Sequence, residues 1–282
     1  MNYSGLAVLI LDAMLRSIAW KVVNPKLFLR GEKVIRAINL YKNYTEFFHK
    51  KEKKIPVIKG ISFTIEKGEF IGIMGRSGCG KTTLLKMIGL IEVPSGGELF
   101  IMEKDVAAMS VSMRSDLRRT RIGFVFQDCE LMSGLRVCDN IGLPLLLNKK
   151  RNSEIDKKVR KLGKDFGISN LLDKYPYDLS GGERQRAAIC RALVNEPDLI
   201  LADEPTGNLD SISGRTVMES FVRINEVFAK TILMVTHDSL MASYCNRVIF
   251  LKDGEIEGNI ERKKYKSQEA YYQNIIDISA TL

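Results

Sequence analysis

The sequence has no long hydrophobic run. A membrane-spanning helix needs roughly 18 consecutive apolar residues, and the run from Leu6 to Leu11 is interrupted by Asp12 and then Arg16. No basic residue precedes this run, so it does not fit a secretory signal peptide. We interpret residues 5–20 as a short amphipathic helix or a disordered extension. The alternative is a translation start further along the chain, for instance at Met14.

Histidine and paired cysteine are also scarce. The only histidines are His49 and His237, which excludes a histidine-rich metal site. An odd, scattered set of cysteines without metal-ligand spacing fits a reducing cytoplasm better than a disulfide framework. These cysteines are Cys79, Cys129, Cys138, Cys190 and Cys245.

Positive charge is in excess, with a net charge of +9 and basic runs at residues 49–54, 149–151 and 262–266. We interpret these runs as solvated loops, with nucleic acid or an anionic membrane surface as alternative partners. The chain has 282 residues, of which 45% are apolar, enough for one large domain with an ordinary core.

A phosphate-binding loop is the strongest local pattern. Residues 75–82 fit G-x-x-x-x-G-K-[ST], between an apolar strand at residues 70–74 and a helix pattern at residues 83–88. Glycines let backbone N–H groups turn towards phosphate oxygens, and the helix N-terminus adds positive potential. Lys81 is expected to reach the β- and γ-phosphates and Thr82 to ligate Mg²⁺. The residues predicted to bind nucleotide here are Gly75, Arg76, Ser77, Gly78, Cys79, Gly80, Lys81, Thr82 and Thr83.

Cys79 lies inside this loop, at a helix N-terminus and near Lys81. Both features favour the thiolate form of its side chain. We expect Cys79 to be a small filler residue, and we expect alkylation of its thiol to block nucleotide binding.

A second apolar strand, at residues 198–204, ends in the acids Asp203 and Glu204. Because side chains alternate along a strand, the two carboxylates point in different directions. Asp203 suits Mg²⁺ and its water shell, and Glu204 suits the general base for an attacking water. Together with the phosphate loop, this strand predicts nucleotide hydrolysis.

The segment between these two elements carries a third pattern, LSGGERQR at residues 179–186. Ser180 supplies a hydroxyl, and Gly181 and Gly182 expose backbone N–H groups that open a helix expected over residues 183–195. This is a second anion site at a helix N-terminus. The pattern resembles the signature motif of the ABC ATPase family, in which the phosphate loop of one subunit and the signature motif of another enclose one ATP.

Other segments agree with this resemblance, which spans roughly residues 34–257. Gln127 is similar to the family's Q-loop glutamine, which senses Mg²⁺ and the γ-phosphate and links to the membrane partner. Asp210 lies in a segment similar to the loop that crosses the dimer interface. His237, after an apolar strand, resembles the switch histidine that contacts the γ-phosphate.

The resemblance also implies an adenine contact and an active site. Tyr44 resembles the aromatic residue that stacks on adenine, with Tyr41 as a rival. Glu183 replaces the glutamine of many members, but Ser180 and the glycines make the phosphate contacts, so the site is expected to be active. The implied catalytic residues are Glu204, His237 and Gln127, and the implied Mg²⁺ ligands are Thr82, Gln127 and Asp203.

The fold expected is α/β: a P-loop NTPase core with a mostly parallel sheet, an antiparallel β subdomain and an inserted helical lobe. An N-terminal extension is expected at residues 1–33, the ABC ATPase domain at 34–257 with its lobe at about 128–190, and a C-terminal tail at 258–282. One lobe helix carries an apolar stripe, with a capping pair at its start and Gly167 at its end. The stripe is Ile155, Val159, Leu162 and Phe166, and the capping pair is Ser153 and Asp156.

The resemblance implies the ATP-binding and hydrolysing subunit of an ABC transporter. Its expected partners are a second, identical ATPase subunit and a separate membrane permease that docks on residues 128–147, at the cytoplasmic face of the plasma membrane. No nucleic-acid partner is expected. Residues 122–127 and 204–211 are similar to ATPases of macrolide export, lipoprotein release and antimicrobial-peptide resistance, and residues 235–238 and 242–254 are closest to the last group. Alternatives are a cell-division or lipoprotein-release ATPase, or a soluble ABC ATPase acting on ribosomes or DNA.

Overall fold

The computed structural model describes residues 31–48 and 51–282. The segment interpreted above as an amphipathic or disordered extension, including Met14, lies outside these described residues. None of the helices in the described part of the chain has the length and hydrophobicity needed to cross a bilayer.

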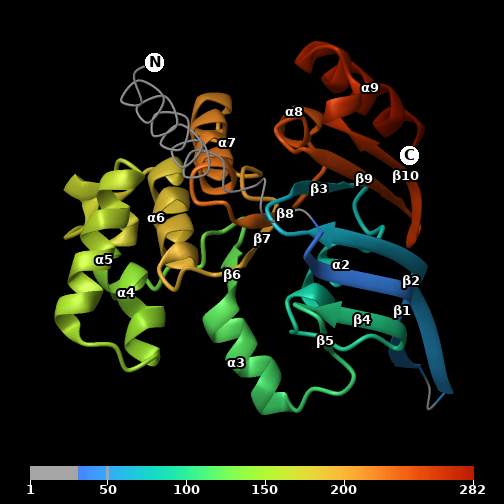
Figure 1. The fold of residues 1–282 in the computed structure, drawn as a ribbon, viewed down its shortest axis with the longest axis horizontal. Coiled ribbons are helices and arrows are strands. Elements are labelled where there is room, and N and C mark those ends of the chain that lie inside the picture. Colours follow the sequence, from blue (N-terminus) through green and yellow to red (C-terminus); the bar gives the residue numbers. More distant parts are fainter. Residues whose placement is uncertain (1–30, 49–50) are drawn as a thin grey trace, which may run out of the picture.

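A six-stranded, mostly parallel sheet forms the centre of the molecule (Figure 1). Its strand order is β10-β9-β3-β8-β7-β6, and only the edge strand β10 is antiparallel to its neighbour. The strands expected from the apolar runs before the phosphate loop, the paired acids and His237 are therefore confirmed. The strands are β3 (Phe70–Met74), β6 (Ile122–Val125), β7 (Leu199–Asp203), β8 (Thr231–Thr236), β9 (Arg247–Lys252) and β10 (Glu255–Glu261).

A second, antiparallel sheet has the order β2-β1-β4-β5 and lies beside the first (Figure 1). One hydrophobic cluster joins its inner face to α2 and to one face of the central sheet. The antiparallel β subdomain predicted from the sequence is thus present. Its strands are β1 (Lys33–Phe48), β2 (Lys51–Glu66), β4 (Gly96–Ile101) and β5 (Lys104–Asp105).

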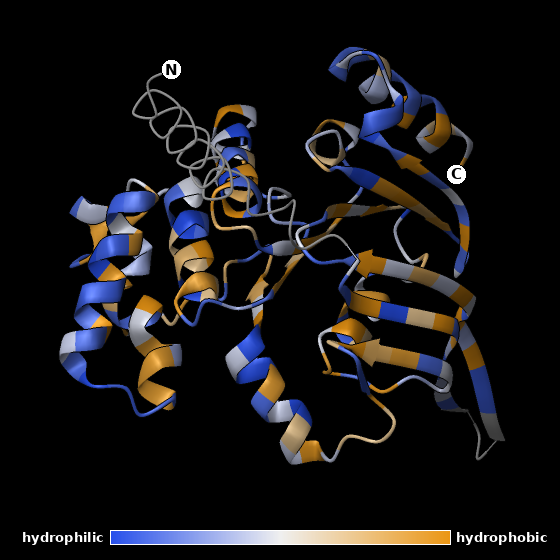
Figure 2. Ribbon diagram, in the orientation of Figure 1, coloured by the Kyte–Doolittle hydropathy of each residue, from blue (hydrophilic) through white to orange (hydrophobic). Residues whose placement is uncertain are grey.

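The helical lobe is built from α4, α5 and α6 on the far side of the central strands from the antiparallel sheet (Figure 1). In Figure 2, α4 is largely hydrophobic, whereas α3 and α5 are mostly hydrophilic. The apolar stripe predicted on α5 faces the lobe core: Val159, Leu162 and Phe166 are buried and Ile155 packs against them. The helices are α2 (Lys81–Ile88), α3 (Val111–Arg121), α4 (Val137–Leu147), α5 (Asn152–Asp165), α6 (Gly181–Leu193), α7 (Ser211–Glu226), α8 (Ser239–Ala242) and α9 (Gln268–Thr281), with short 3₁₀ turns at η2 (Ser169–Leu171), η3 (Pro176–Asp178) and η4 (Arg262–Lys264).

Two helix starts differ from the prediction. Arg151 is the N-cap of α5, so Ser153 already lies inside the helix, and the Asp156 carboxylate pairs with Arg160 instead of capping. The helix of the signature motif begins at Gly181 rather than at residue 183, because Ser180 caps it directly. The end of α5 is as predicted, since Gly167 adopts φ +66° and lets the chain reverse.

The C-terminal segment is structured and joined to the core. The boundary expected at residue 257 falls inside β10. Tyr271 and Ile275 of α9 are fully buried within the larger hydrophobic cluster, so the last helix packs on the ATPase core.

Candidate nucleotide-binding and ATPase site

The phosphate loop turns from β3 into α2 over glycines that no other residue could replace without strain. Gly80 has φ +105° and precedes the helix as its N-cap. A Cβ atom on Gly75 would lie 2.2 Å from the Leu251 carbonyl oxygen. The Lys81 ammonium is buried and donates to the carbonyl oxygens of Gly75 and Arg76 at 2.8 and 2.9 Å. The loop thus holds a cation beside the N-terminus of α2, the electrostatics that phosphate binding requires.

Cys79 differs from the expectation of a thiolate. Its side chain is 6% exposed, and burial raises the pKa of the thiol despite the opposing charge of Lys81. The helix terminus and the lysine are present, but the loss of hydration outweighs them. The thiol is therefore protonated at neutral pH, which agrees with its expected role as a filler residue.

The paired acids end β7 beside the loop. The Thr82 hydroxyl donates to Asp203 Oδ1 at 3.4 Å, so the structure brings together the two residues predicted to share a metal. Burial raises the pKa of the Asp203 carboxyl, and the Thr82 hydrogen bond opposes this in part. A cation at this position would satisfy a partly buried carboxylate.

Glu204 and His237 form a second pair at the same edge of the sheet. His237 Nδ1 lies 2.9 Å from Glu204 Oε2. The backbone N–H of Glu204 donates to the Val235 carbonyl at 2.9 Å, which ties the end of β7 to β8. Glu204 has φ +45°, a conformation that non-glycine residues rarely adopt and that often occurs where function requires it.

Gln127 lies just after β6 in a chain of three polar side chains. Its Nε2 donates to Asn208 Oδ1 at 3.0 Å, and Asn208 Nδ2 donates to Asp128 Oδ1 at 2.8 Å. Asn208 and Asp128 were not among the predicted site residues. They are 80 positions apart, and only the general rule that loops after parallel strands meet at one sheet edge could have signalled the contact.

The signature motif forms a capping box at the start of α6. Glu183 N donates to Ser180 Oγ at 3.4 Å, while Glu183 Oε2 accepts from Ser180 N at 2.8 Å and from Ser180 Oγ at 2.9 Å. These bonds hold the pKa of the Glu183 carboxyl below its usual range. Gly181 and Gly182 approach Leu209 and Ser213 closely, so the motif packs on the loop that starts α7.

Helix α6 is also attached to the loop that follows Gln127. Gln185 Nε2 donates to the Phe126 carbonyl at 3.0 Å, and its Oε1 accepts from Cys129 Sγ at 2.6 Å. Arg191 donates to the carbonyls of Cys129 and Glu130. Loop and helix therefore form one unit on the lobe side of the site.

The remaining predicted residues have local roles in the structure. Asp210 caps α7, accepting from the N–H groups of Ile212 and Ser213 at 3.0 Å each. The Tyr44 hydroxyl donates to Glu92 Oε2 at 2.6 Å and lies beside Thr83, which places the ring near the start of α2. Burial is the main cause that raises the pKa of Tyr44.

The two predicted anion sites lie on different parts of the fold. Figure 1 places α2, which follows the phosphate loop, beside the antiparallel sheet and α6 in the helical lobe, with central strands between them. Among the described residues, no group of three or more histidine, cysteine or acidic side chains could hold a metal.

Comparison with known proteins agrees with this geometry. The sequence model of the ABC transporter family matches residues 58–207. The ABC transporter ATP-binding protein YxdL of Bacillus subtilis (strain 168) is 44% identical over 83% of this chain and 90% of its own length. The bacitracin export ATP-binding protein BceA of Halalkalibacterium halodurans is 39% identical over 88% of this chain and 96% of its own length.

Solved structures give the same relationship. The dimeric structure of MJ0796, described as a bacterial ABC transporter cassette, has a TM-score of 0.72 and 38% identity, covering 80% of this chain and 98% of that one. A post-hydrolysis dimer of MJ0796 bound to ADP and Pi has a TM-score of 0.73 and 36% identity over the same shares of the two chains. Because the family match covers more than half of the residues and carries the phosphate loop and both acids, this chain belongs to the ABC transporter family, as an ATP-binding subunit that hydrolyses ATP.

Proposed function

We propose that the chain closes as a dimer around two ATP molecules, each held between the phosphate loop of one protomer and the signature motif of its partner. The separation of α2 and α6 within one chain supports this arrangement, because the two anion sites of one protomer do not face each other across one nucleotide (Figure 1). The dimers solved for MJ0796 also support it. In the closed form Ser180, Gly181, Gly182 and Glu183 face the partner's ATP, Asp210 lies at the interface, and Tyr44 stacks on adenine.

Mg²⁺ fits the oxygen atoms at the ends of β6 and β7. Thr82, Asp203 and Gln127 would hold it, and it would neutralise charge on the β- and γ-phosphates. Two observations support this assignment: the Thr82–Asp203 contact of 3.4 Å brings two oxygen ligands together, and burial, which raises the pKa of the Asp203 carboxyl, favours a cation beside it.

Glu204 is the general base and His237 its partner. The contact of 2.9 Å between them is the observation that carries this proposal. It uses His237 Nδ1, so a contact of Nε2 with a γ-phosphate oxygen requires the imidazolium form, in which both ring nitrogens donate. Glu204 then orients the attacking water and accepts its proton.

The test is Glu204→Gln, an isosteric change that removes the base. We expect ATP turnover to fall by about 100-fold or more, while ATP binding persists and size-exclusion chromatography shows an ATP-dependent dimer. Ser180→Arg in the same background should leave nucleotide binding by each monomer intact but prevent the dimer. Unchanged hydrolysis in Glu204→Gln would exclude Glu204 as the base.

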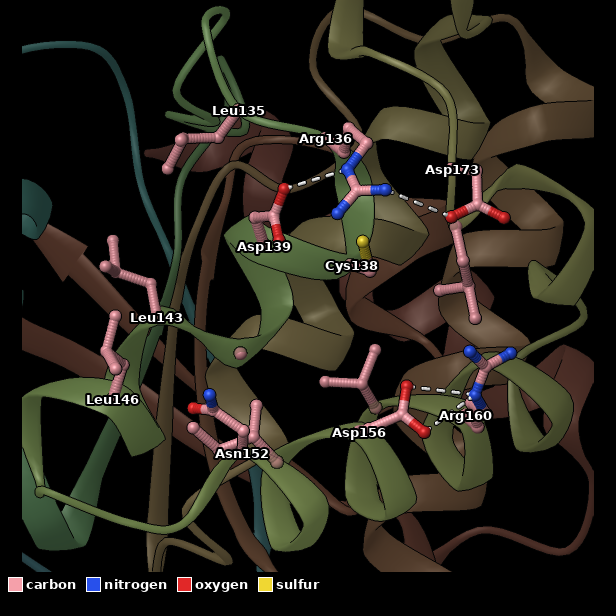
Figure 3. Close-up of a pocket in the computed structure, with 14 residues that line it drawn as sticks. Leu135, Arg136, Cys138, Asp139, Leu143, Leu146, Asn152, Asp156, Arg160 and Asp173 are labelled. Carbon is pink, nitrogen blue, oxygen red and sulfur yellow. Dashed lines mark hydrogen bonds and ion pairs between the residues drawn. The ribbon is translucent and has the colours of Figure 1, made fainter.

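The permease is proposed to dock on residues 128–147. Two grooves flank α4. The groove on its α5 side has three ion pairs on its rim, Arg136 with Asp139 and Asp173 and Arg160 with Asp156 (Figure 3). The groove on its α3 side, about 770 Å³, has Glu130 as the one acid among its described lining residues; of its arginines Arg119 pairs with Asp116, whereas Arg118 and Arg191 donate to backbone carbonyls. The α3 side therefore suits a permease segment with acidic and apolar side chains.

A matched pair of variants tests this choice. Leu147 lines the α3-side groove and Leu146 the α5-side groove, and both are exposed, at 62% and 56%. Leu147→Asp should abolish co-purification with the permease, whereas Leu146→Asp should retain it. The reverse result would move the docking site to the α5 side.

We further propose that the transporter acts in antimicrobial-peptide resistance at the cytoplasmic face of the plasma membrane. The similarity to BceA over nearly its whole length supports this cargo class. A lipoprotein-release function is the second candidate, since LolD of Aquifex aeolicus is 43% identical over 73% of this chain. Growth of a deletion strain on bacitracin, with complementation by the wild-type and Glu204→Gln chains, separates the two. Unaltered sensitivity would exclude bacitracin as the peptide against which this transporter protects.

A further inference from the structure

The side chains of Gln127, Asn208 and Asp128 form a hydrogen-bonded chain whose direction is fixed at one end. An ionised carboxylate can only accept hydrogen bonds. Asp128 Oδ1 therefore takes the amide nitrogen of Asn208, at 2.8 Å. This leaves Asn208 Oδ1 on the opposite side, where it can only accept. The group that it meets there, at 3.0 Å, must be the Gln127 nitrogen.

The consequence reaches the nucleotide site. An amide group carries an oxygen and a nitrogen of similar size, and a free glutamine can present either one. Because Nε2 of Gln127 is committed to Asn208, its oxygen points away from that contact. A cation such as Mg²⁺ binds oxygen and not an amide N–H. The direction of these hydrogen bonds thus decides whether the Gln127 side chain can serve as a Mg²⁺ ligand.

The backbone around Gly207 supports this arrangement. A Cβ atom on Gly207 would lie 3.1 Å from Gln127 Nε2 and 3.2 Å from its Cδ, so the amide plane rests on the glycine. Gly207 N in turn donates to the Glu204 carbonyl at 3.0 Å. The amide of Gln127 is therefore placed against the same turn that carries the catalytic carboxylate.

We propose that Asp128 and Asn208 are positioning residues that orient the Gln127 amide with its oxygen towards the cation of bound ATP. This inference rests on the proposed role of Gln127 as a Mg²⁺ ligand. Neither positioning residue touches the nucleotide in this assignment. The Asp128 carboxylate fixes the orientation of the Asn208 amide, and the Asn208 amide in turn fixes the orientation of the Gln127 amide.

The experiment measures the affinity of ATP by calorimetry, in EDTA and in Mg²⁺, in the Glu204→Gln background, where binding is separated from turnover. The quantity compared is the ratio of the two dissociation constants. Asp128→Asn keeps the size of the side chain but allows both directions of the chain. If the two directions are equally populated, half of the protein is competent, and the Mg²⁺-dependent gain falls by about twofold. The affinity in EDTA should not change.

The exchange Asp128→Asn with Asn208→Asp provides the decisive control. It moves the carboxylate to the middle position, where its two oxygens accept from both neighbours and again demand the Gln127 nitrogen. We expect the double variant to recover the wild-type ratio. Glu130→Gln, which removes an exposed carboxylate from the same loop, should leave the ratio unchanged.

Two results overturn the inference. One is an unchanged ratio in Asp128→Asn; the other is a double variant no better than the single one. Gln127→Ala distinguishes the source of failure. If Gln127→Ala lowers the ratio while Asp128→Asn does not, the ligand role stands and the positioning role is wrong. If Gln127→Ala has no effect, both are wrong.

Discussion

Tyr265 and Tyr271, whose rings pack at a tilt of 52° near the C-terminal helix, should respond with opposite signs to the loss of a hydroxyl. Tyr271 of α9 is fully buried, and its Oη has no hydrogen-bond partner among the described residues. Burial also raises the pKa of its phenol. Tyr265 packs against it with ring centroids 5.2 Å apart, and its hydroxyl donates to Asn274 Oδ1 at 2.7 Å.

The magnitudes follow from these environments. A buried hydroxyl without a partner costs about 1–3 kcal/mol, whereas a satisfied one contributes about 0.5–1.5 kcal/mol. Tyr271→Phe should therefore raise the free energy of unfolding, and Tyr265→Phe should lower it. With a slope of about 3 kcal/mol/M, a change of 1.5 kcal/mol moves the urea midpoint by about 0.5 M.

Urea unfolding of the nucleotide-free protein, followed by circular dichroism, measures both changes. The slope should stay constant, so that the midpoint alone reports stability. A lower midpoint for Tyr271→Phe would mean that the hydroxyl is satisfied in solution and that the reasoning from burial is wrong.

Two further predictions concern the nucleotide site. Because burial raises the pKa of the Cys79 thiol, iodoacetamide should alkylate Cys79 at pH 7 at least about tenfold more slowly than it alkylates a free thiol. The rate should rise as the pH passes above the ordinary pKa range of cysteine. A rate equal to that of free cysteine would contradict this prediction. Asp203→Asn removes a carboxylate whose pKa is raised by burial, so the nucleotide-free protein should melt about 1–3 °C higher. The increase is small because the group stays partly solvated. Calorimetry of the same variant should show no Mg²⁺-dependent gain in ATP affinity. A lower melting temperature would show that the Thr82 contact outweighs desolvation.

Much of the fold was predictable where the sequence carries a continuous apolar strand or a motif. The strands β3, β7 and β8 are apolar runs that end in the phosphate loop, the paired acids and His237, so pattern and position agree. Helix α3 was not predicted, because none of its residues is buried and it therefore has no apolar stripe. The helix α9 was also missed and was taken as a C-terminal tail, although Tyr271, Ile275 and Ile278 recur at helical spacing and pack on the core.

The site was predictable as a set of residues but not as a set of contacts. Spacing after strands brings Thr82 to Asp203 and Glu204 to His237, as parallel topology requires. The thiolate expected for Cys79 was wrong, because a local argument from the helix terminus does not include burial. The hydrogen-bonded chain through Asn208 joins two loops distant in sequence, and the spacing of residues in the sequence does not indicate which atoms donate and which accept.

The hydrogen bonds between α6 and the loop that follows Gln127 have a mechanical consequence. The helix has 13 residues, a rod of about 20 Å. The loop grips it at two places, Gln185 near the middle and Arg191 near the end opposite Ser180. Because the helix is bonded to the loop at two separate residues, it cannot rotate relative to the loop without breaking one of these contacts. A displacement of that loop would therefore move the whole helix, and with it the Ser180 hydroxyl at the N-terminus of α6.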